Sequence, residues 1–124
     1  MMKRILNNHT DKSSTEMGNR ATIEVKDWDG DSAVCYLYIH WLGDPDQVVT
    51  MVKKAAPIMR KCDPDYAMAR LIGMYHQEIE GGLSVAVTNR KEKWDNGHYV
   101  VDMRKGTIKN GRKTFAKNLE FGNF

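Results

Sequence analysis

Asp44-Pro45-Asp46 and Asp63-Pro64-Asp65 are two copies of one helix-start signal, and the fold of the chain is best read outward from them. Each copy supplies an aspartate that can cap a helix, a proline where no amide partner is needed, and a second carboxylate at the positive end of the helix dipole. The apolar spacing that follows predicts one helix over residues 45–60 and a second over residues 64–77. Pro57 has no amide hydrogen, so it predicts a kink or a break near the end of the first helix.

Strand-like segments lie on both sides of this helical pair. Before it, residues 21–26 alternate between apolar and polar side chains, and residues 33–41 form an almost unbroken apolar and aromatic run. After it, the segments that fit strands are residues 83–87, 98–103 and 107–108. Strands grouped before and after a helical block predict an α+β two-layer sandwich. We expect an antiparallel sheet of four to five strands, in the chain order ββααβββ, with both helices on one face.

The length of 124 residues is enough for one domain and too short for two separate cores. Residues 1–16 are mostly polar and have no period, so we expect a disordered leader. A single α+β domain is expected over residues 17–110. Residues 111–124 are basic and have little period, which predicts a loosely ordered tail in which a phenylalanine can dock on the domain.

Nothing in the sequence indicates export or a membrane span. No apolar run approaches the roughly 20 residues of a membrane-spanning helix, and residues 1–15 lack the apolar core of a signal peptide. Cys35 and Cys62 are too few for a disulfide framework, so we expect reduced thiols. These features predict a cytoplasmic protein that does not bind membranes.

Few side chains suit catalysis or metal binding. The histidines and cysteines that can be considered are His40, His76, His98, Cys35 and Cys62. Each has an ordinary structural place, and no nucleophile elbow, phosphate loop or zinc spacing accompanies them. The alternating carboxylates of Asp27, Asp29 and Asp31 resemble a calcium loop but lack its bidentate glutamate, so a hairpin turn explains them better. We therefore expect no enzyme, no metal and no cofactor.

Aromatic side chains are the stronger candidates for a binding surface. In the 33–41 run, Tyr36 and Tyr38 lie on the face opposite to Leu37 and Ile39, so one of these two sets faces away from the helices. Tyrosine and tryptophan anchor many protein interfaces. The residues expected to bind a partner protein are Tyr36, Tyr38, Trp41, Trp28, Asp29 and Trp94. It is equally open that these rings close the second face of the sheet against a chain end.

The net charge of +3 comes from the chain ends, because residues 104–124 carry six cations and only Glu120 as an anion. Cations interleaved with aromatic rings are typical of nucleic-acid-binding segments, although basic tails also serve solubility. In this alternative, the residues expected to contact nucleic acid are Lys109, Arg112, Lys113 and Lys117.

Four segments carry a resemblance: Met17-Gly18-Asn19-Arg20-Ala21, Tyr38-Ile39-His40-Trp41-Leu42-Gly43, Tyr66-Ala67-Met68-Ala69-Arg70-Leu71 and Asp95-Asn96-Gly97-His98-Tyr99. Together they resemble a group of small uncharacterised proteins encoded by phages and mobile elements, over about residues 17–103. The resemblance implies a setting: small phage accessory proteins without catalytic motifs often inhibit a host protein, including CRISPR effectors. We therefore expect a non-enzymatic, anti-CRISPR-like inhibitor of a host protein, with a nucleic-acid-binding accessory protein as the alternative and a homodimer also open.

Overall fold

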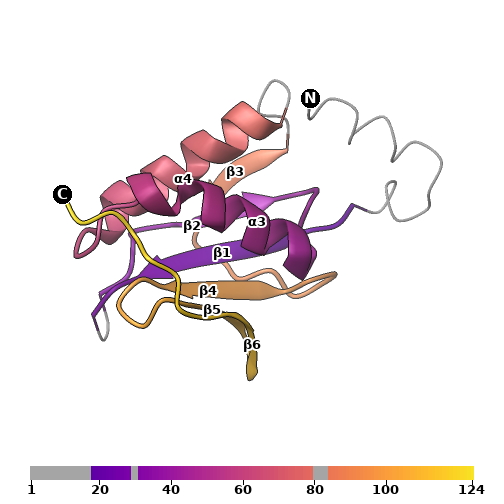
Figure 1. The fold of residues 1–124 in the computed structure, drawn as a ribbon. Helices are drawn as coiled ribbons and strands as arrows, with labels where there is room; N and C mark the ends of the chain where they lie inside the picture. The colour runs from indigo at the N-terminus through magenta and orange to yellow at the C-terminus, as the bar shows by residue number, and fades with distance from the viewer. Residues whose placement is uncertain (1–17, 29–30, 80–83) are drawn as a thin grey trace.

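In the part of the chain that the structure describes, two α-helices pack on one face of a six-stranded sheet (Figure 1). The structure is a computed structural model and describes residues 18–28, 31–79 and 84–124. The helical layer consists of α3 (Pro45–Ala55), a 3-10 turn η2 (Ala56–Ile58) and α4 (Pro64–Glu78). The strands are β1 (Ala21–Lys26), β2 (Tyr36–Ile39), β3 (Val85–Thr88), β4 (His98–Asp102), β5 (Thr107–Asn110) and β6 (Lys113–Ala116). The α+β class is confirmed, and the expected leader over residues 1–16 lies outside the described residues.

The sheet is mixed, which corrects the expectation of four to five antiparallel strands. Its strand order is β3-β2-β1-β4-β5-β6, and β1 pairs with β4 in parallel while every other pair is antiparallel. The parallel register runs from Thr22 opposite His98 to Lys26 opposite Asp102. β3 and β4 follow each other in the chain, and the pairings make them run in the same direction on opposite sides of β1. Residues 89–97, which connect them, must therefore cross from one side of β1 to the other.

The two helix starts use their aspartates differently. The Asp63 carboxylate accepts a hydrogen bond from the Tyr66 amide at 3.2 Å, as a capping residue does. Asp44 makes no such bond and instead accepts one from the side-chain amide of Asn19 at 2.9 Å. The break expected at Pro57 is confirmed, since the first helix ends at Ala55 and continues only as a 3-10 turn.

The core lies between the sheet and the helices. On β1, Ala21, Ile23 and Val25 are fully buried, whereas the alternate side chains point to the other face. Helix positions such as Val52 and Leu71 pack on the same layer. None of the helices in the described ranges is both long and apolar enough to cross a membrane.

Two segments differ from the expected elements. Only Tyr36–Ile39 of the 33–41 run is a strand, and Val34 ahead of it is 84% exposed. The segment 111–124, expected to be a loosely ordered tail, contains β6, which pairs with β5, and Phe121, which is buried. The chain therefore continues the sheet beyond residue 110, where the sequence shows no apolar period.

Candidate functional site

The face of the sheet opposite α3 and α4 is the candidate site, and we call it the open face (Figure 1). Because successive side chains of a strand point to opposite faces of the sheet, the residues between the buried core residues point to the open face. The open-face side chains of β1, β2 and β4 include Thr22, Glu24, Lys26, Tyr36, Tyr38 and His98. Most of them are polar and only partly buried. A sheet face that packs into a hydrophobic core would carry mainly buried apolar side chains instead.

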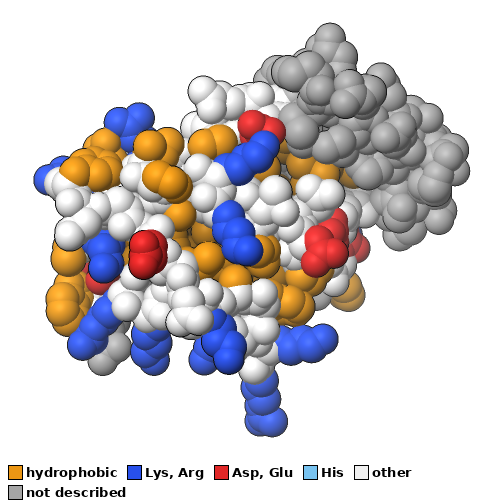
Figure 2. All heavy atoms as spheres, in the orientation of Figure 1, with side chains coloured by type: hydrophobic (Ala, Val, Ile, Leu, Met, Phe, Trp, Pro, Cys, Tyr) orange, Lys and Arg blue, Asp and Glu red, His pale blue; other side chains and the backbone are white. Residues whose placement is uncertain are grey.

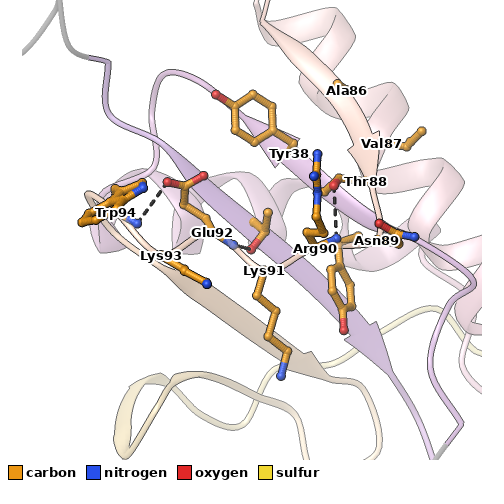
Figure 3. A pocket seen from close by; sticks show the side chains of 12 residues that line it. Tyr38, Ala86, Val87, Thr88, Asn89, Arg90, Lys91, Glu92, Lys93 and Trp94 are labelled. Atoms are coloured by element: carbon orange, nitrogen blue, oxygen red, sulfur yellow. Dashed lines mark hydrogen bonds between the residues drawn. The ribbon is translucent and has the colours of Figure 1, made fainter.

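A hollow of about 940 Å³ lies on this face, and we call it the aromatic hollow. It is lined by Tyr36 and Tyr38 of β2, by β3 and by residues 89–94 of the crossing segment. Figure 3 shows the crossing segment over the sheet, with Asn89 beside β3 and Trp94 at the opposite end. The Trp94 side chain is 67% exposed. A large ring at the rim of a hollow is thus available to a partner.

The structure brings three of the six expected protein-binding residues together. Tyr36, Tyr38 and Trp94 line the aromatic hollow. Trp41 instead lies partly buried against the core and meets the His40 ring edge-on at 4.8 Å between centroids. Trp28 lies elsewhere and is 48% exposed, with the Arg104 guanidinium 4.2 Å from its ring centroid. Asp29 lies outside the described residues.

A chain of hydrogen bonds ties the crossing segment to the sheet. The Glu92 amide donates to the Thr22 hydroxyl oxygen at 2.9 Å, and that hydroxyl lies 2.7 Å from Nδ1 of His98. Nε2 of His98 lies 2.9 Å from the Glu24 carboxylate, which also accepts from Ser32 at 2.9 Å. A carboxylate only accepts, so Nε2 carries the proton and Nδ1 of the neutral ring accepts from Thr22. The floor of the aromatic hollow and its wall are therefore linked through Thr22.

The pKa values in this chain agree with a neutral histidine. Burial lowers the pKa of His98 below its ordinary value, against the opposing effect of the Glu24 hydrogen bond. For Glu24, burial acts to raise the pKa, but the hydrogen bonds from His98 and Ser32 outweigh burial and hold that pKa below its ordinary value. This chain of hydrogen bonds thus contains one neutral imidazole, that of His98, and one carboxylate, that of Glu24, which stays ionised near neutral pH.

A hydroxyl, an imidazole and a carboxylate joined in this order by hydrogen bonds are also the parts of a nucleophilic catalytic triad. Thr22, however, is only 1% exposed, and its oxygen already accepts the Glu92 amide. Attack on a substrate would require this oxygen to be accessible. These hydrogen bonds connect the crossing segment to the sheet.

A second polar cluster supports the same end of the sheet. Arg20 binds the Asp95 carboxylate through both its amide, at 3.0 Å, and its Nε, at 2.9 Å. The amide of Asn96 donates to the Arg20 carbonyl, and the Gly43 amide donates to the Asn19 carbonyl. Residues 19–20, Gly43 and residues 95–96, from three separate parts of the chain, meet in this cluster. Its contacts hold the turn that follows Trp94 against the start of β1.

The charges on the open face are unbalanced. Its carboxylates are already engaged by donors of this chain: Glu24 by His98 and Ser32, Glu92 by the Trp94 amide and Asp102 by the Lys105 amide. No ion pair among the described residues engages the cations that line its two hollows, which are Lys26, Arg90, Lys91, Lys93, Lys105 and Lys109. The open face therefore offers free positive charge to a partner.

The second hollow, of about 220 Å³, is lined by Lys26, Lys105 and Lys109, and we call it the lysine hollow. These lysines come from β1, the β4–β5 turn and β5. In Figure 2, Lys and Arg side chains gather on the side of the molecule where β4, β5 and β6 lie in Figure 1. The aromatic hollow reaches Thr22 and the lysine hollow reaches Lys26, so the two are separated by roughly 13 Å along β1, at about 3.3 Å per residue.

The four expected nucleic-acid-binding residues lie close to this second hollow or beyond it. Lys109 lines it. Arg112 and Lys113 are exposed at the β5–β6 turn, and the Lys113 ammonium lies 5.5 Å from the Phe115 ring centroid. Lys117 is exposed after the end of β6.

Sequence reasoning counted Lys105 and Lys109 among the C-terminal cations but missed the other cations that the fold brings to the open face, which are Lys26, Arg90, Lys91 and Lys93. The run Arg90-Lys91-Glu92-Lys93 directly precedes Trp94, and this adjacency was a usable signal. Lys26 gave none, because only the parallel pairing of β1 with β4 brings it to the hollow that Lys105 and Lys109 also line.

No group of three or more His, Cys, Asp or Glu side chains within the described ranges is placed to hold a metal ion. The open face presents aromatic rings, hydrogen-bonding groups and cations. Comparison with known proteins identifies no matching family model, and no curated protein and no solved structure is significantly similar to the chain.

Proposed function

We propose that this protein acts without catalysis, by binding another protein at the aromatic hollow of its open face. The observation that carries the proposal is that Trp94, which is far in the sequence from Tyr36 and Tyr38, lines a single hollow with them. Interfaces draw most of their affinity from a few such aromatic anchors seated in pockets. The partner is expected to insert an apolar or aromatic group of its own there.

The charges around the hollow support a partner whose contact surface is acidic. Arg90, Lys91 and Lys93 line the hollow, and the one carboxylate among them, Glu92, accepts the Trp94 amide and lies 3.9 Å from Arg20. Complementary charges mainly speed association and select the partner. An acidic patch beside an apolar anchor is therefore the feature to expect on the bound protein.

The biological setting rests on the resemblance to small proteins of phages and mobile elements. In that setting the partner is a host protein, such as a CRISPR effector or another defence protein, and binding inhibits it in the cytoplasm. A solid hydrogen-bonded frame behind the hollow suits this role, because a rigid surface loses little entropy on binding. Thr22 and Asp95 supply that frame.

The experiment is affinity capture from a lysate of the host cell, with the wild-type protein and three variants as bait. Tyr38→Ala and Trp94→Ala remove anchors from the aromatic hollow, and Trp28→Ala is the matched control because it removes an exposed ring elsewhere. We expect one protein to be retained by the wild type and by Trp28→Ala. Its apparent affinity should fall about 30-fold in the other two variants, the effect of losing a typical anchor. Equal retention by all four baits would contradict the proposal.

A further inference from the structure

Beyond the proposed function, we propose that the lysine hollow binds single-stranded nucleic acid, with phosphates on its lysines and a base stacked on Trp28. This binding site is separate from the aromatic hollow. It also differs from a basic-tail site, because Lys26 and Lys105 lie outside the tail.

The first argument is the concentration of uncompensated charge. Lys26, Lys105 and Lys109 line one hollow of about 220 Å³, and none of them forms an ion pair with a described residue. Asp102 also lines the hollow, but one of its oxygens accepts the Lys105 amide at 3.0 Å. Lysine ammonium groups bind phosphate as point charges. The hollow thus keeps a net positive charge that a run of phosphates would neutralise.

The second argument is a hydroxyl without a partner. Thr107 lines the same hollow, and its oxygen is buried and makes no hydrogen bond within the described chain. Leaving a buried hydroxyl unpaired has a free-energy cost. A phosphate oxygen bound in the hollow is a candidate acceptor for this hydroxyl.

The third argument is an exposed ring that lies close in sequence to a residue of the hollow and contacts the neighbour of another. Trp28 follows Lys26 by two residues, and Arg104, which directly precedes Lys105, places its guanidinium 4.2 Å from the Trp28 ring centroid. The Trp28 side chain is 48% exposed. An aromatic face with a neighbouring arginine is the type of platform on which unpaired bases stack.

These observations favour a single strand over other anions. A lone phosphate or a phosphorylated side chain would need only one cluster of donors, usually with arginine in a forked geometry. Here several lysines line one hollow, and an exposed ring follows two residues after Lys26. Arg112 of the β5–β6 turn follows Gly111, which also lines the hollow. A duplex keeps its bases stacked inside and would leave the ring unused.

The test is fluorescence anisotropy with a labelled oligothymidine of about 12 nucleotides, a length within the range of known single-strand sites. The wild type is compared with the triple variant Lys26→Ala/Lys105→Ala/Lys109→Ala over a series of salt concentrations. Loss of three phosphate contacts should reduce the slope of log affinity against log salt by about 2 units for a single strand. Trp28→Ala should weaken binding about tenfold, the usual effect of one stacked base.

Two matched controls locate the site. Lys53→Ala/Lys61→Ala removes exposed lysines from the helical layer and should leave the slope unchanged. Arg112→Ala/Lys113→Ala/Lys117→Ala tests a basic-tail site, and we expect a smaller change in slope than the hollow variant gives. Circular dichroism melting of each variant excludes unfolding as the cause.

The proposal is overturned if the oligonucleotide does not bind at about 50 mM salt, or if the tail variant and not the hollow variant abolishes binding. Equal affinity for a duplex of the same length, or for an abasic strand, would also overturn it, because neither uses the exposed ring. If inorganic phosphate binds to the hollow but the oligonucleotide does not, the hollow is a simple anion site and the proposal is likewise overturned. Trp94→Ala should bind the oligonucleotide normally, so failure here is separate from failure of protein docking.

Discussion

His98 shows how one partly buried side chain makes the open face sensitive to pH. Its ring is held between Thr22 and Glu24, and burial keeps the pKa of His98 below the ordinary 6.5 of the unfolded chain. Between the lower pKa of the folded state and the ordinary pKa of 6.5, the unfolded state therefore binds the proton more readily than the folded state does. The stability contributed by neutral His98 is fully present above pH 6.5 and is lost as the pH falls through the lower folded pKa.

We accordingly expect the melting temperature of the wild type to fall between pH 7 and pH 5. His98→Gln cannot be protonated, so its melting temperature should change less over the same pH interval. At pH 7 the melting temperature of this variant should be lower than that of the wild type. The pKa of Glu24 also lies below its ordinary value, and its contribution is lost only under more acidic conditions, as the pH falls through that folded pKa. Parallel pH profiles for the wild type and His98→Gln would contradict this account.

Thr22 is the side chain that joins the sheet to the crossing segment. Thr22→Val keeps the shape but removes the hydroxyl that accepts the Glu92 amide and donates to His98. Leaving these buried groups unpaired should cost about 1–3 kcal/mol of unfolding free energy and should speed hydrogen exchange at the Glu92 amide. Thr50→Val is the matched control, because the Thr50 hydroxyl is exposed and donates only to the Asp46 carbonyl. Equal effects of the two variants in denaturant unfolding would show that the Thr22 link is unimportant.

The helices and their connections contain glycines with opposite roles. A Cβ on Gly43, between β2 and α3, would lie 2.3 Å from the Asn19 carbonyl oxygen, whereas a Cβ on Gly73 in α4 would meet nothing within 4 Å. Gly43→Ala should therefore destabilise the protein by about 1–3 kcal/mol through overpacking. Gly73→Ala should stabilise it by about 1 kcal/mol through helix propensity. Thermal melts of the two single variants decide this, and a shift of the same sign in both would refute the assignment.

Local sequence signals predicted the helices well because the signals act within a few residues. Both proline-containing starts and the break at Pro57 lie where the sequence places them. The parallel pairing of β1 with β4 was not predictable in this way, since it depends on where residues 89–97 cross. β6 was missed because Lys113–Ala116 has no apolar alternation and reads as part of a basic tail.

For the molecule as a whole, the sequence indicated the ring types of the candidate site but not their grouping. Tyr36 and Tyr38 were assigned to one face by strand alternation, and the structure places their neighbours Leu37 and Ile39 in the core. Trp94 joins them only because the crossing segment returns over the open face (Figure 3). The cations of the two hollows come from separate elements, so their convergence follows from topology and not from any local motif.

Hydroxyl-radical footprinting of the captured complex tests most directly the claim that a partner protein docks on the open face. The account predicts that oxidation of Trp94, which is 67% exposed in the free protein, falls sharply in the complex. Ile58, which is 41% exposed at the end of the helical layer, should be oxidised equally in the free and bound protein. Protection of Ile58 with Trp94 still fully reactive would place the partner on the helices and contradict the account.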